Sequence, residues 1–281
     1  MRMSGQKEFE TGTVLDDRAL ISLRDVVVDF ATRDNIVRAV DGISLDMPEG
    51  GFTALVGPSG CGKSTVLNMV AGLLKPSQGS VSFEGKPVDG PNTRVGYMTQ
   101  KDTLLPWRTV EDNVGIAFEL RCRREARCEK AKRVAEMIER VGLKGFERHY
   151  PSELSGGMRK RAALARLLLY RPSTQLLDEP FGALDAQLRL IMQKELLDLV
   201  DASGMSVVLV THDLEEAVSL ADKVVVFTSR PGRIRAVRDI PIARPRDPAT
   251  LRFTDAFRDH CAALWEELRD EVARAMETRN A

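Results

Sequence analysis

The sequence predicts an α/β protein built around a mostly parallel sheet. The first observation is a short apolar run at residues 52–56 that ends in a glycine-rich loop and is followed by a helical pattern. The second is a regular alternation of strand and helix patterns between residues 176 and 227. Strands that alternate with helices are typical of a parallel sheet covered by helices. With 281 residues, the chain can form one large domain or a domain with an appendage.

The individual elements follow in order along the chain. Short β-type runs at residues 19–23, 26–30 and 43–45 precede the run at 52–56, and a helix over 64–74 with Gly72 near its end leads through a turn to a strand at 80–83. The middle third is predicted to be helical, from Thr109, where Asp112 completes a capping box, and again over 124–141. The remaining pattern predicts strands at 176–177, 207–210 and 224–227, and helices over 186–202 and from 214.

The two ends of the chain differ from this middle part. Residues 1–18 have no periodicity and are predicted to form a flexible tail. Beyond Pro241 the character changes, and Asp247 followed by Pro248 fits the start of a last helix. Apolar residues recur along it at steps of three and four, so we expect it to pack on its own domain rather than on a partner: Phe253, Phe257, Cys261, Leu264, Leu268, Val272 and Ala275.

Composition excludes several classes of protein. Lys plus Arg and Asp plus Glu both number 41, so no basic excess indicates a nucleic-acid partner. The four cysteines, Cys61, Cys122, Cys128 and Cys261, lack metal-ligand spacing and favour a reducing cytoplasm. No apolar run approaches the ~18 residues of a membrane helix, so at a membrane another chain would span it. Residues 121–133 hold seven basic and two acidic side chains, which favours a solvated helix face over a contact with lipid or a partner.

The glycine-rich loop has the pattern of a phosphate-binding loop, with a strand before it and a helix after it. Its residues are Gly57, Pro58, Ser59, Gly60, Cys61, Gly62, Lys63 and Ser64. Inward-pointing backbone amides and the positive end of the helix dipole together favour a polyphosphate. We expect Lys63 to reach the β- and γ-phosphates, Ser64 to bind Mg²⁺ and Thr65 to add a phosphate contact. The amides would also favour the Cys61 thiolate, although a small side chain filling the loop is the alternative.

Two further motifs define the chemistry. A short apolar strand ends in Asp178 and Glu179. At this position we expect Asp178 to hold Mg²⁺ and Glu179 to polarise an attacking water. Upstream stands Leu-Ser-Gly-Gly-Met at residues 154–158, which leads into an arginine-rich helix. With this combination the chain resembles the ATP-binding cassette (ABC) family over about residues 20–235.

The resemblance implies an ABC ATPase fold, in which the mostly parallel sheet carries an antiparallel β subdomain and an inserted helical subdomain, here about 105–165. The cassette would span 19–240 and a helical extension 241–281. Ser155, Gly156 and Gly157 would cap the γ-phosphate of ATP held by a second copy of the chain. The resemblance assigns further roles by motif: Gln100 senses Mg²⁺ and the lytic water, Asp185 belongs to the D-loop, His212 contacts the γ-phosphate, and Phe30 stacks on adenine.

Four positions depart from the family pattern. Met158 stands where glutamine is most common, and Phe30 replaces a tyrosine while still offering a ring for stacking. Thr174 and Gln175 interrupt the usual apolar run before Asp178, so we expect the start of that strand to be loosened.

Segments at 104–110, 178–185 and 229–234 resemble the branch of the family that serves importers of nitrate, sulfonate and taurine. This implies an ATP-hydrolysing subunit on the cytoplasmic face of the membrane. Its partners would be a second copy, two permease subunits and, indirectly, an extracytoplasmic solute-binding protein, with ATP and Mg²⁺ as ligands. An ABC exporter ATPase is the alternative, and a non-transport ABC ATPase is a more distant one.

Overall fold

The computed structural model describes residues 19–32, 35–120 and 127–280. The tail predicted at 1–18 and the first part of the basic stretch, 121–126, lie outside the described residues.

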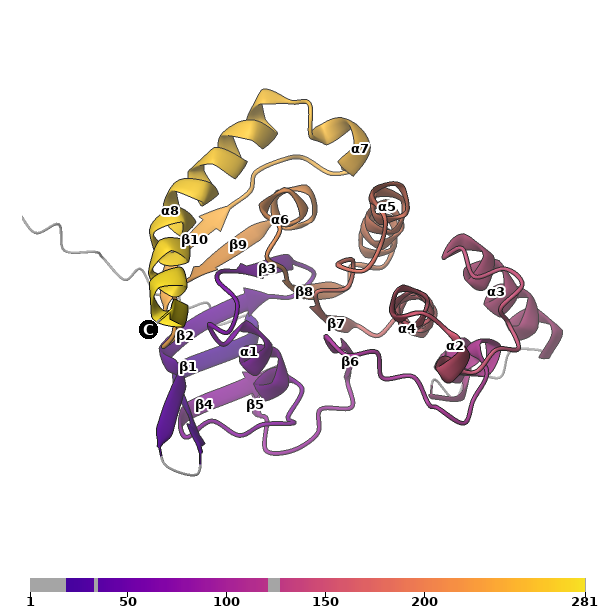
Figure 1. The fold of residues 1–281 in the computed structure, drawn as a ribbon, viewed down its shortest axis with the longest axis horizontal. Coiled ribbons are helices and arrows are strands. Elements are labelled where there is room, and N and C mark those ends of the chain that lie inside the picture. The colour runs from indigo at the N-terminus through magenta and orange to yellow at the C-terminus, as the bar shows by residue number, and fades with distance from the viewer. Residues whose placement is uncertain (1–18, 33–34, 121–126, 281) are drawn as a thin grey trace, which may run out of the picture.

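One of the two sheets is antiparallel and is formed mainly by the N-terminal part of the chain (Figure 1). It has the order β2-β1-β4-β5, with β1 (Ala19–Ala31), β2 (Ile36–Pro48), β4 (Gln78–Phe83) and β5 (Lys86–Pro87). The two runs predicted at 19–23 and 26–30 are a single strand. The register of β1 shifts between Leu23 and Val26, where Asp25 has a φ of 45°. This irregularity explains why the sequence pattern breaks within a continuous strand.

The second sheet is the predicted mostly parallel one. Its order is β10-β9-β3-β8-β7-β6, with β3 (Phe52–Val56), β6 (Val95–Met98), β7 (Thr174–Asp178), β8 (Ser206–Val210), β9 (Lys223–Phe227) and β10 (Ile234–Asp239). Among the described strands of this sheet, only β10 pairs antiparallel, with β9. Every residue of β3, β7 and β8 is buried, which explains the nearly continuous apolar sequences of β3 and β8. The predicted fold class is therefore confirmed.

Strand β7 begins two residues earlier than predicted. Thr174 and Gln175 were expected to loosen its start, but both pair in register with β6 on one side and β8 on the other. The expectation is wrong because backbone pairing on both sides holds the strand irrespective of its side chains. Both side chains are buried, at 1% and 0% exposed, and their polar atoms have no hydrogen-bond partner among the described residues.

Helices separate and cover the two sheets. α1 (Lys63–Val70) lies between them and contacts β4 on one side and β7 and β8 on the other (Figure 1). The opposite face of the parallel sheet shares a core with α4 (Gly156–Tyr170), α5 (Ala186–Ser203) and α6 (Leu214–Leu220). Beyond α4 lie α2 (Val110–Leu120) and α3 (Arg127–Arg140), and the 3₁₀ turn η1 (Pro151–Glu153) precedes α4. This places the phosphate-binding loop, which precedes α1, at the junction of the two sheets.

A buried asparagine fixes the chain before α2. Asn113 is 0% exposed, and its amide accepts from Leu105 N at 2.7 Å and donates to the carbonyls of Leu105, Arg108 and Thr109 at 3.0 to 3.1 Å. The Thr109 hydroxyl accepts from Asp112 N at 3.3 Å, so the predicted helix start is confirmed. Because these bonds hold residues 105–109, Trp107 stands outward and is 71% exposed.

The C-terminal segment forms two helices rather than the single one predicted. Asp247 caps α7 (Pro248–Leu251) as expected, but the chain turns and α8 (Asp255–Asn280) begins afresh. The Thr254 hydroxyl, which accepts from Phe257 N at 3.3 Å, provides the new start.

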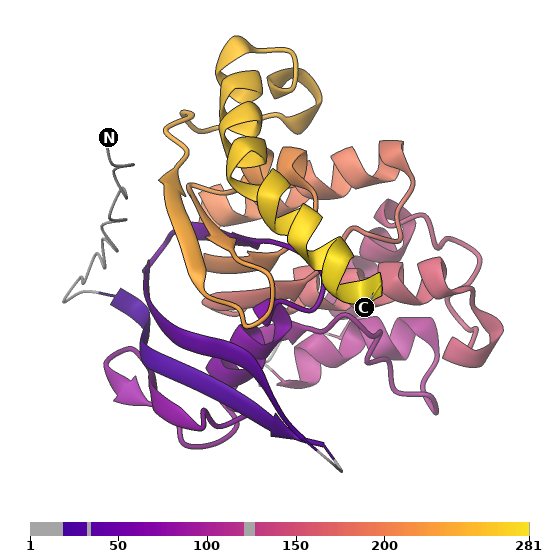
Figure 2. The same ribbon diagram turned by 60° about the vertical axis from the view of Figure 1, so that its left-hand side comes forward.

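Helix α8 packs on α6 and β9 (Figure 2). Its residues Phe257, Leu264 and Leu268 are buried in the main core, whereas Phe253 precedes the helix and is 77% exposed. Packing on its own chain is therefore confirmed. Within the described ranges, none of the helices combines the length and apolar character needed to span a membrane.

Candidate nucleotide-binding site

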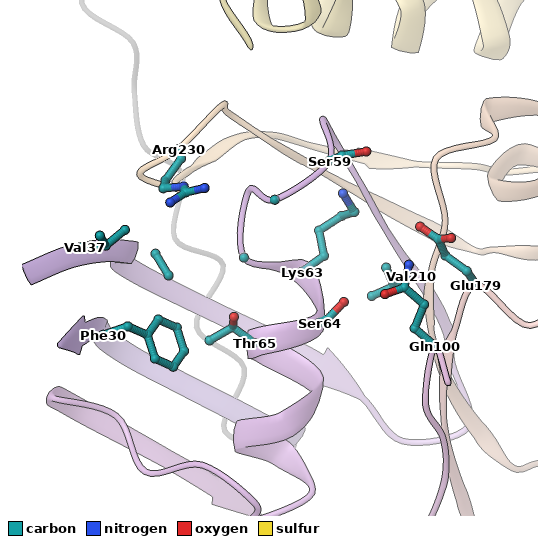
Figure 3. A pocket seen from close by; sticks show the side chains of 13 residues that line it. Phe30, Val37, Ser59, Lys63, Ser64, Thr65, Gln100, Glu179, Val210 and Arg230 are labelled. Carbon is teal, nitrogen blue, oxygen red and sulfur yellow. The ribbon is translucent and has the colours of Figure 1, made fainter. Parts of the chain in front are cut away.

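The loop between β3 and α1 forms the floor of a pocket of about 370 Å³. Figure 3 shows side chains from β1, β2, α1 and the ends of β7 and β8 facing this space. The residues that line it are Phe30, Val37, Ala39, Ser59, Gly60, Gly62, Lys63, Ser64, Thr65, Gln100, Glu179, Val210 and Arg230.

Two glycines allow the loop to fold this tightly. Gly62 has a φ of 99°, and a Cβ placed on it would lie 2.7 Å from Val40 Cγ2. Gly57 has a φ of 154°, and a Cβ there would lie 2.9 Å from Phe227 Cβ. Any larger residue would meet a neighbouring strand while occupying a backbone conformation that side chains disfavour. The glycines of the predicted motif therefore have a steric reason for their positions.

Lys63, the first residue of α1, spans the loop with its side chain. Its ammonium donates hydrogen bonds to the carbonyls of Gly57 at 2.7 Å and Pro58 at 2.8 Å, and the residue is only 6% exposed. These bonds hold a positive charge at the N-terminus of a helix, where the helix dipole is also positive. The pocket therefore has a built anion site at its floor.

Asp178 ends β7 on the far side of this charge. It is 3% exposed, and burial raises the pKa of its carboxyl, while a hydrogen bond with the Ser64 hydroxyl acts in the opposite direction. Its Oδ1 is buried and has no hydrogen-bond partner within the described part of the chain. A carboxylate oxygen left unpaired beside a serine hydroxyl is the type of donor set that Mg²⁺ takes together with nucleotide phosphates and waters. These residues therefore fit the metal.

Glu179 follows in a conformation that a glutamate rarely adopts, with a φ of 50°. Its backbone N donates to Val210 O at 2.9 Å, and Lys160 of α4 donates to its carbonyl at 3.3 Å. Its carboxylate reaches the pocket wall, and Oε1 lies 3.4 Å from Nδ1 of His212, which is 64% exposed. Backbone strain of this kind is concentrated at functional sites, where surrounding contacts impose it.

The other predicted pocket residues lie at its two ends. Phe30 on β1 lies beside Val37 and Ala39 of β2 and forms the apolar end, with 42% of Phe30 exposed (Figure 3). Gln100 lies at the opposite end with Glu179, and Thr65 lies between the two ends (Figure 3). An aromatic ring at one end and polar groups at the other suit a ligand with a base and a phosphate chain.

The predicted residues at the starts of α4 and α5 are not among those that line this pocket. Ser155 is the N-cap of α4, accepting from Met158 N at 3.3 Å, and Gly156 and Gly157 follow it. Asp185 caps α5, accepting from Leu188 N at 2.9 Å. The segments that carry them touch each other, because a Cβ on Gly157 would lie 3.2 Å from the Ala183 carbonyl oxygen. Within one chain, the starts of α4 and α5 therefore lie next to each other and contribute none of these residues to the pocket lining.

The prediction that the loop amides favour the Cys61 thiolate is wrong. Cys61 is 1% exposed, and burial raises the pKa of its thiol more than the neighbouring Lys63 lowers it. The desolvation of a buried anion outweighs the nearby dipoles. The alternative, a small side chain that fills the loop, describes what the structure shows.

Sequence reasoning missed several groups at the site. Val37, Ala39 and Val210 have no recognisable signal because they contribute apolar surface only. Lys160 lies in the arginine-rich helix, whose pattern does not say which cation faces Glu179. Arg230 stands in the segment 229–234 that suggested a branch of the family, but nothing in the pattern placed it in the pocket.

Comparisons with known proteins agree with this geometry. The family model described as ABC transporter matches residues 40–182. The taurine import ATP-binding protein TauB of Rhizobium johnstonii is 41% identical over 86% of this chain and 91% of its own. The aliphatic sulfonates import ATP-binding protein SsuB of Bacillus subtilis is 40% identical over 89% of this chain and 95% of its own. A solved dimeric ATP-binding cassette in a post-hydrolysis state with ADP and Pi superposes with a TM-score of 0.71 at 28% identity, covering 79% of this chain and all of that one.

The chain belongs to the ABC transporter family. Within that family it is an ATP-binding subunit, an ATPase that powers transport.

Proposed function

We propose that this chain is the ATP-hydrolysing subunit of an importer for a small solute of the nitrate, sulfonate or taurine type. The observation that carries the proposal is the single pocket in which Lys63, Ser64, Glu179 and Gln100 converge at the polar end and Phe30 stands at the apolar end. The import functions that relatives carry in their names support the solute class.

The polar residues in and beside the pocket have distinct roles in hydrolysis under this proposal. Lys63 and the loop amides hold the phosphates, and Thr65 adds a contact. Mg²⁺ would neutralise phosphate charge, held by Ser64 and Asp178 with Gln100 beside it. Glu179 accepts the proton of the attacking water, and His212, 3.4 Å from that carboxylate, contacts the γ-phosphate.

A second copy of the chain would complete the site. The Ser155 end of α4 and the Asp185 segment lie outside the pocket, although each has features suited to a nucleotide. The Met158 amide is bonded to the Ser155 hydroxyl, whereas the amides of Gly156 and Gly157 at the start of α4 would meet a phosphate from another chain. The solved cassette is a dimer bound to ADP and Pi, which supports pairing of two copies. In the head-to-tail pairing proposed for this chain, each ATP would lie between the Lys63 loop of one copy and Ser155 of the other.

A groove next to Gln100 is the proposed docking surface for a membrane permease. It has a volume of about 350 Å³ and lies between β6, α2 and α4, with Val95, Met98, Leu105, Ile116, Ala117, Leu120 and Leu167 among its lining residues. Trp107 stands on the exposed turn just after Leu105, and Leu120 is 61% exposed. A largely apolar groove beside exposed hydrophobic residues suits a short helix from another chain. Two permease subunits would accordingly hold two copies of this chain at the cytoplasmic face of the membrane, and a solute-binding protein would act on the other side.

The experiment compares the two tryptophans of the chain. Trp107→Ala should reduce copurification with coexpressed permease subunits, because exposed aromatic residues are frequent anchors of interfaces. Trp265→Ala, which removes a ring that is also exposed, at 53%, but lies on α8, is the matched control. ATP binding by each isolated variant should equal that of the unmodified chain. Equal permease recovery for both variants would refute the docking surface, and solute-stimulated ATP turnover in the assembled complex tests the transport function itself.

A further inference from the structure

The loop between β9 and β10, residues 228–233, is pressed against the phosphate-binding loop. A Cβ on Gly232 would lie 1.9 Å from the Cys61 carbonyl oxygen, so glycine alone permits this approach. Gly232 N donates to Ala39 O at 2.9 Å, and Asp41 N donates to Gly232 O at 3.0 Å. One end of the 228–233 loop is thereby fixed against both β2 and the phosphate-binding loop.

The other end of the 228–233 loop is held by the C-terminal helix α8. Glu271 is 1% exposed, and its Oε2 accepts from Ser229 N at 2.9 Å and Ser229 Oγ at 3.1 Å. Its Oε1 accepts from Arg235 at 2.8 Å and Arg274 at 2.9 Å. Burial acts to raise the pKa of Glu271, but the hydrogen bonds from Ser229 and the two arginine charges together lower it. Glu271 is therefore a buried, ionised and fully bonded anchor.

Arg230 lies between these two anchors and faces the nucleotide pocket (Figure 3). A Cβ on Gly60 would lie 3.8 Å from its Nη2, which places the guanidinium at the mouth of the phosphate-binding loop. Three other arginines of this hairpin are neutralised by carboxylates: Arg233 by Asp41, Arg235 by Glu271 and Arg238 by Glu267. Among the described residues, Arg230 has no such carboxylate. A guanidinium with free donors at the edge of an anion site is suited to bind phosphate oxygens.

We propose that Arg230 binds the phosphate chain of the nucleotide, and that α8 acts as a strap which positions Arg230 through Glu271 and Ser229. The inference rests on the nucleotide site proposed above and adds Arg230 to the residues that bind the nucleotide there. It also gives a role to the C-terminal helix, which lies beyond the residues matched by the family model. Helix α8 would then set nucleotide affinity although it does not itself line the pocket.

The test measures binding of a fluorescent ATP analogue to the full chain. Arg230→Gln should weaken binding about tenfold or more, as expected for the loss of a hydrogen bond to a charged group. Arg230 is exposed, so this variant should fold normally. Glu271→Gln should weaken binding by a smaller factor. Glu267→Gln is the matched control, because Glu267 also joins α8 to Arg235 and Arg238 but does not touch Ser229.

The double variant separates positioning from general stability. If Glu271 acts through Arg230, adding Glu271→Gln to Arg230→Gln should cause no further loss of affinity. If the two substitutions weaken nucleotide binding independently, α8 does not act through Arg230 and the proposed strap is wrong. The strap is also wrong if Glu267→Gln weakens binding as much as Glu271→Gln does. Competition by inorganic triphosphate should weaken in Arg230→Gln as much as ATP binding does. If triphosphate competes unchanged, the contact is not to phosphate.

Lys63→Ala distinguishes failure of this inference from failure of the proposed site. Should Lys63→Ala lose binding while Arg230→Gln binds ATP like the unmodified chain, the Arg230 contact is wrong and the site stands. Should Lys63→Ala also bind normally, the proposed nucleotide site itself is wrong.

Discussion

Glu216 is a buried carboxyl directly behind the His212 segment, and its ionisation should make the stability of the fold depend on pH. The residue is 6% exposed and lies on α6, where the Gln193 amide donates to its Oε1 at 3.2 Å and the Thr211 hydroxyl also bonds to the carboxylate. Burial is the main reason that its pKa rises from 4.5 to about 7, with the negative charge of Asp213 adding to it and Arg189 opposing it. The folded state therefore holds this proton more tightly than the unfolded state.

The direction and size of the effect follow from this difference in pKa. Because the folded pKa lies above the unfolded one, the stabilisation is fully present below pH 4.5 and is lost as the pH rises through about 7. Each pKa unit corresponds to about 1.4 kcal/mol, so the contribution of Glu216 should fall by on the order of 2 to 3 kcal/mol between about pH 5 and pH 8. Glu216→Gln removes the titrating group while keeping its shape and should abolish this contribution.

The assay is urea unfolding of the nucleotide-free chain at intervals from pH 5 to pH 8. The free energy of unfolding of Glu216→Gln minus that of the unmodified chain should increase steadily with pH, since all other titrating groups cancel in the difference. Glu215→Gln is the control, because Glu215 is the adjacent residue but its side chain is 60% exposed. A difference for Glu216→Gln that stays constant across this range would refute the reasoning.

Two further predictions concern the pocket. Glu179→Gln should bind ATP with nearly unchanged affinity but hydrolyse it more slowly by about 10²- to 10⁴-fold, as expected for loss of a general base, and turnover close to that of the unmodified chain would count against the assignment. Cys61, 1% exposed with a raised pKa, should be alkylated far more slowly than the exposed Cys128 whether or not nucleotide is present, as peptide mass spectrometry can measure. Equal labelling rates in the folded protein would show that the loop is more open than described.

The sequence identified the fold where burial and periodicity agree. Strands β3 and β8 are buried on both faces, so their apolar runs are unambiguous. It failed where a local interaction overrides the pattern. The C-terminal apolar stripe predicts one helix, but the Thr254 hydroxyl caps the start of a second helix, α8, within that segment. Likewise, the polar side chains of Thr174 and Gln175 do not predict a buried strand, yet backbone pairing with two neighbouring strands holds both residues there.

The site shows the same division. A phosphate-binding loop is local in sequence, so the positions of Lys63 and Ser64 at the pocket follow from spacing alone. The environment of a group is not local. Whether the pKa of the Cys61 thiol is raised or lowered depends on how deeply the loop is buried. The position of Arg230 depends on a loop that is held by α8, far along the chain. Such properties require the tertiary structure.

The central claim is that each ATP is bound between two chains, one contributing Lys63 and the other Ser155. The most direct test mixes a chain carrying Lys63→Ala with a chain carrying Ser155→Arg, each of which should trap no nucleotide as a homodimer because both of its sites are damaged. In a head-to-tail heterodimer, one site combines both defects and the other contains an intact Lys63 and an intact Ser155. Verified heterodimers should therefore trap nucleotide at one of their two sites. If they trap none under conditions in which the unmodified chain traps nucleotide normally, the shared site is contradicted, since every site would then belong to a single chain and keep one defect.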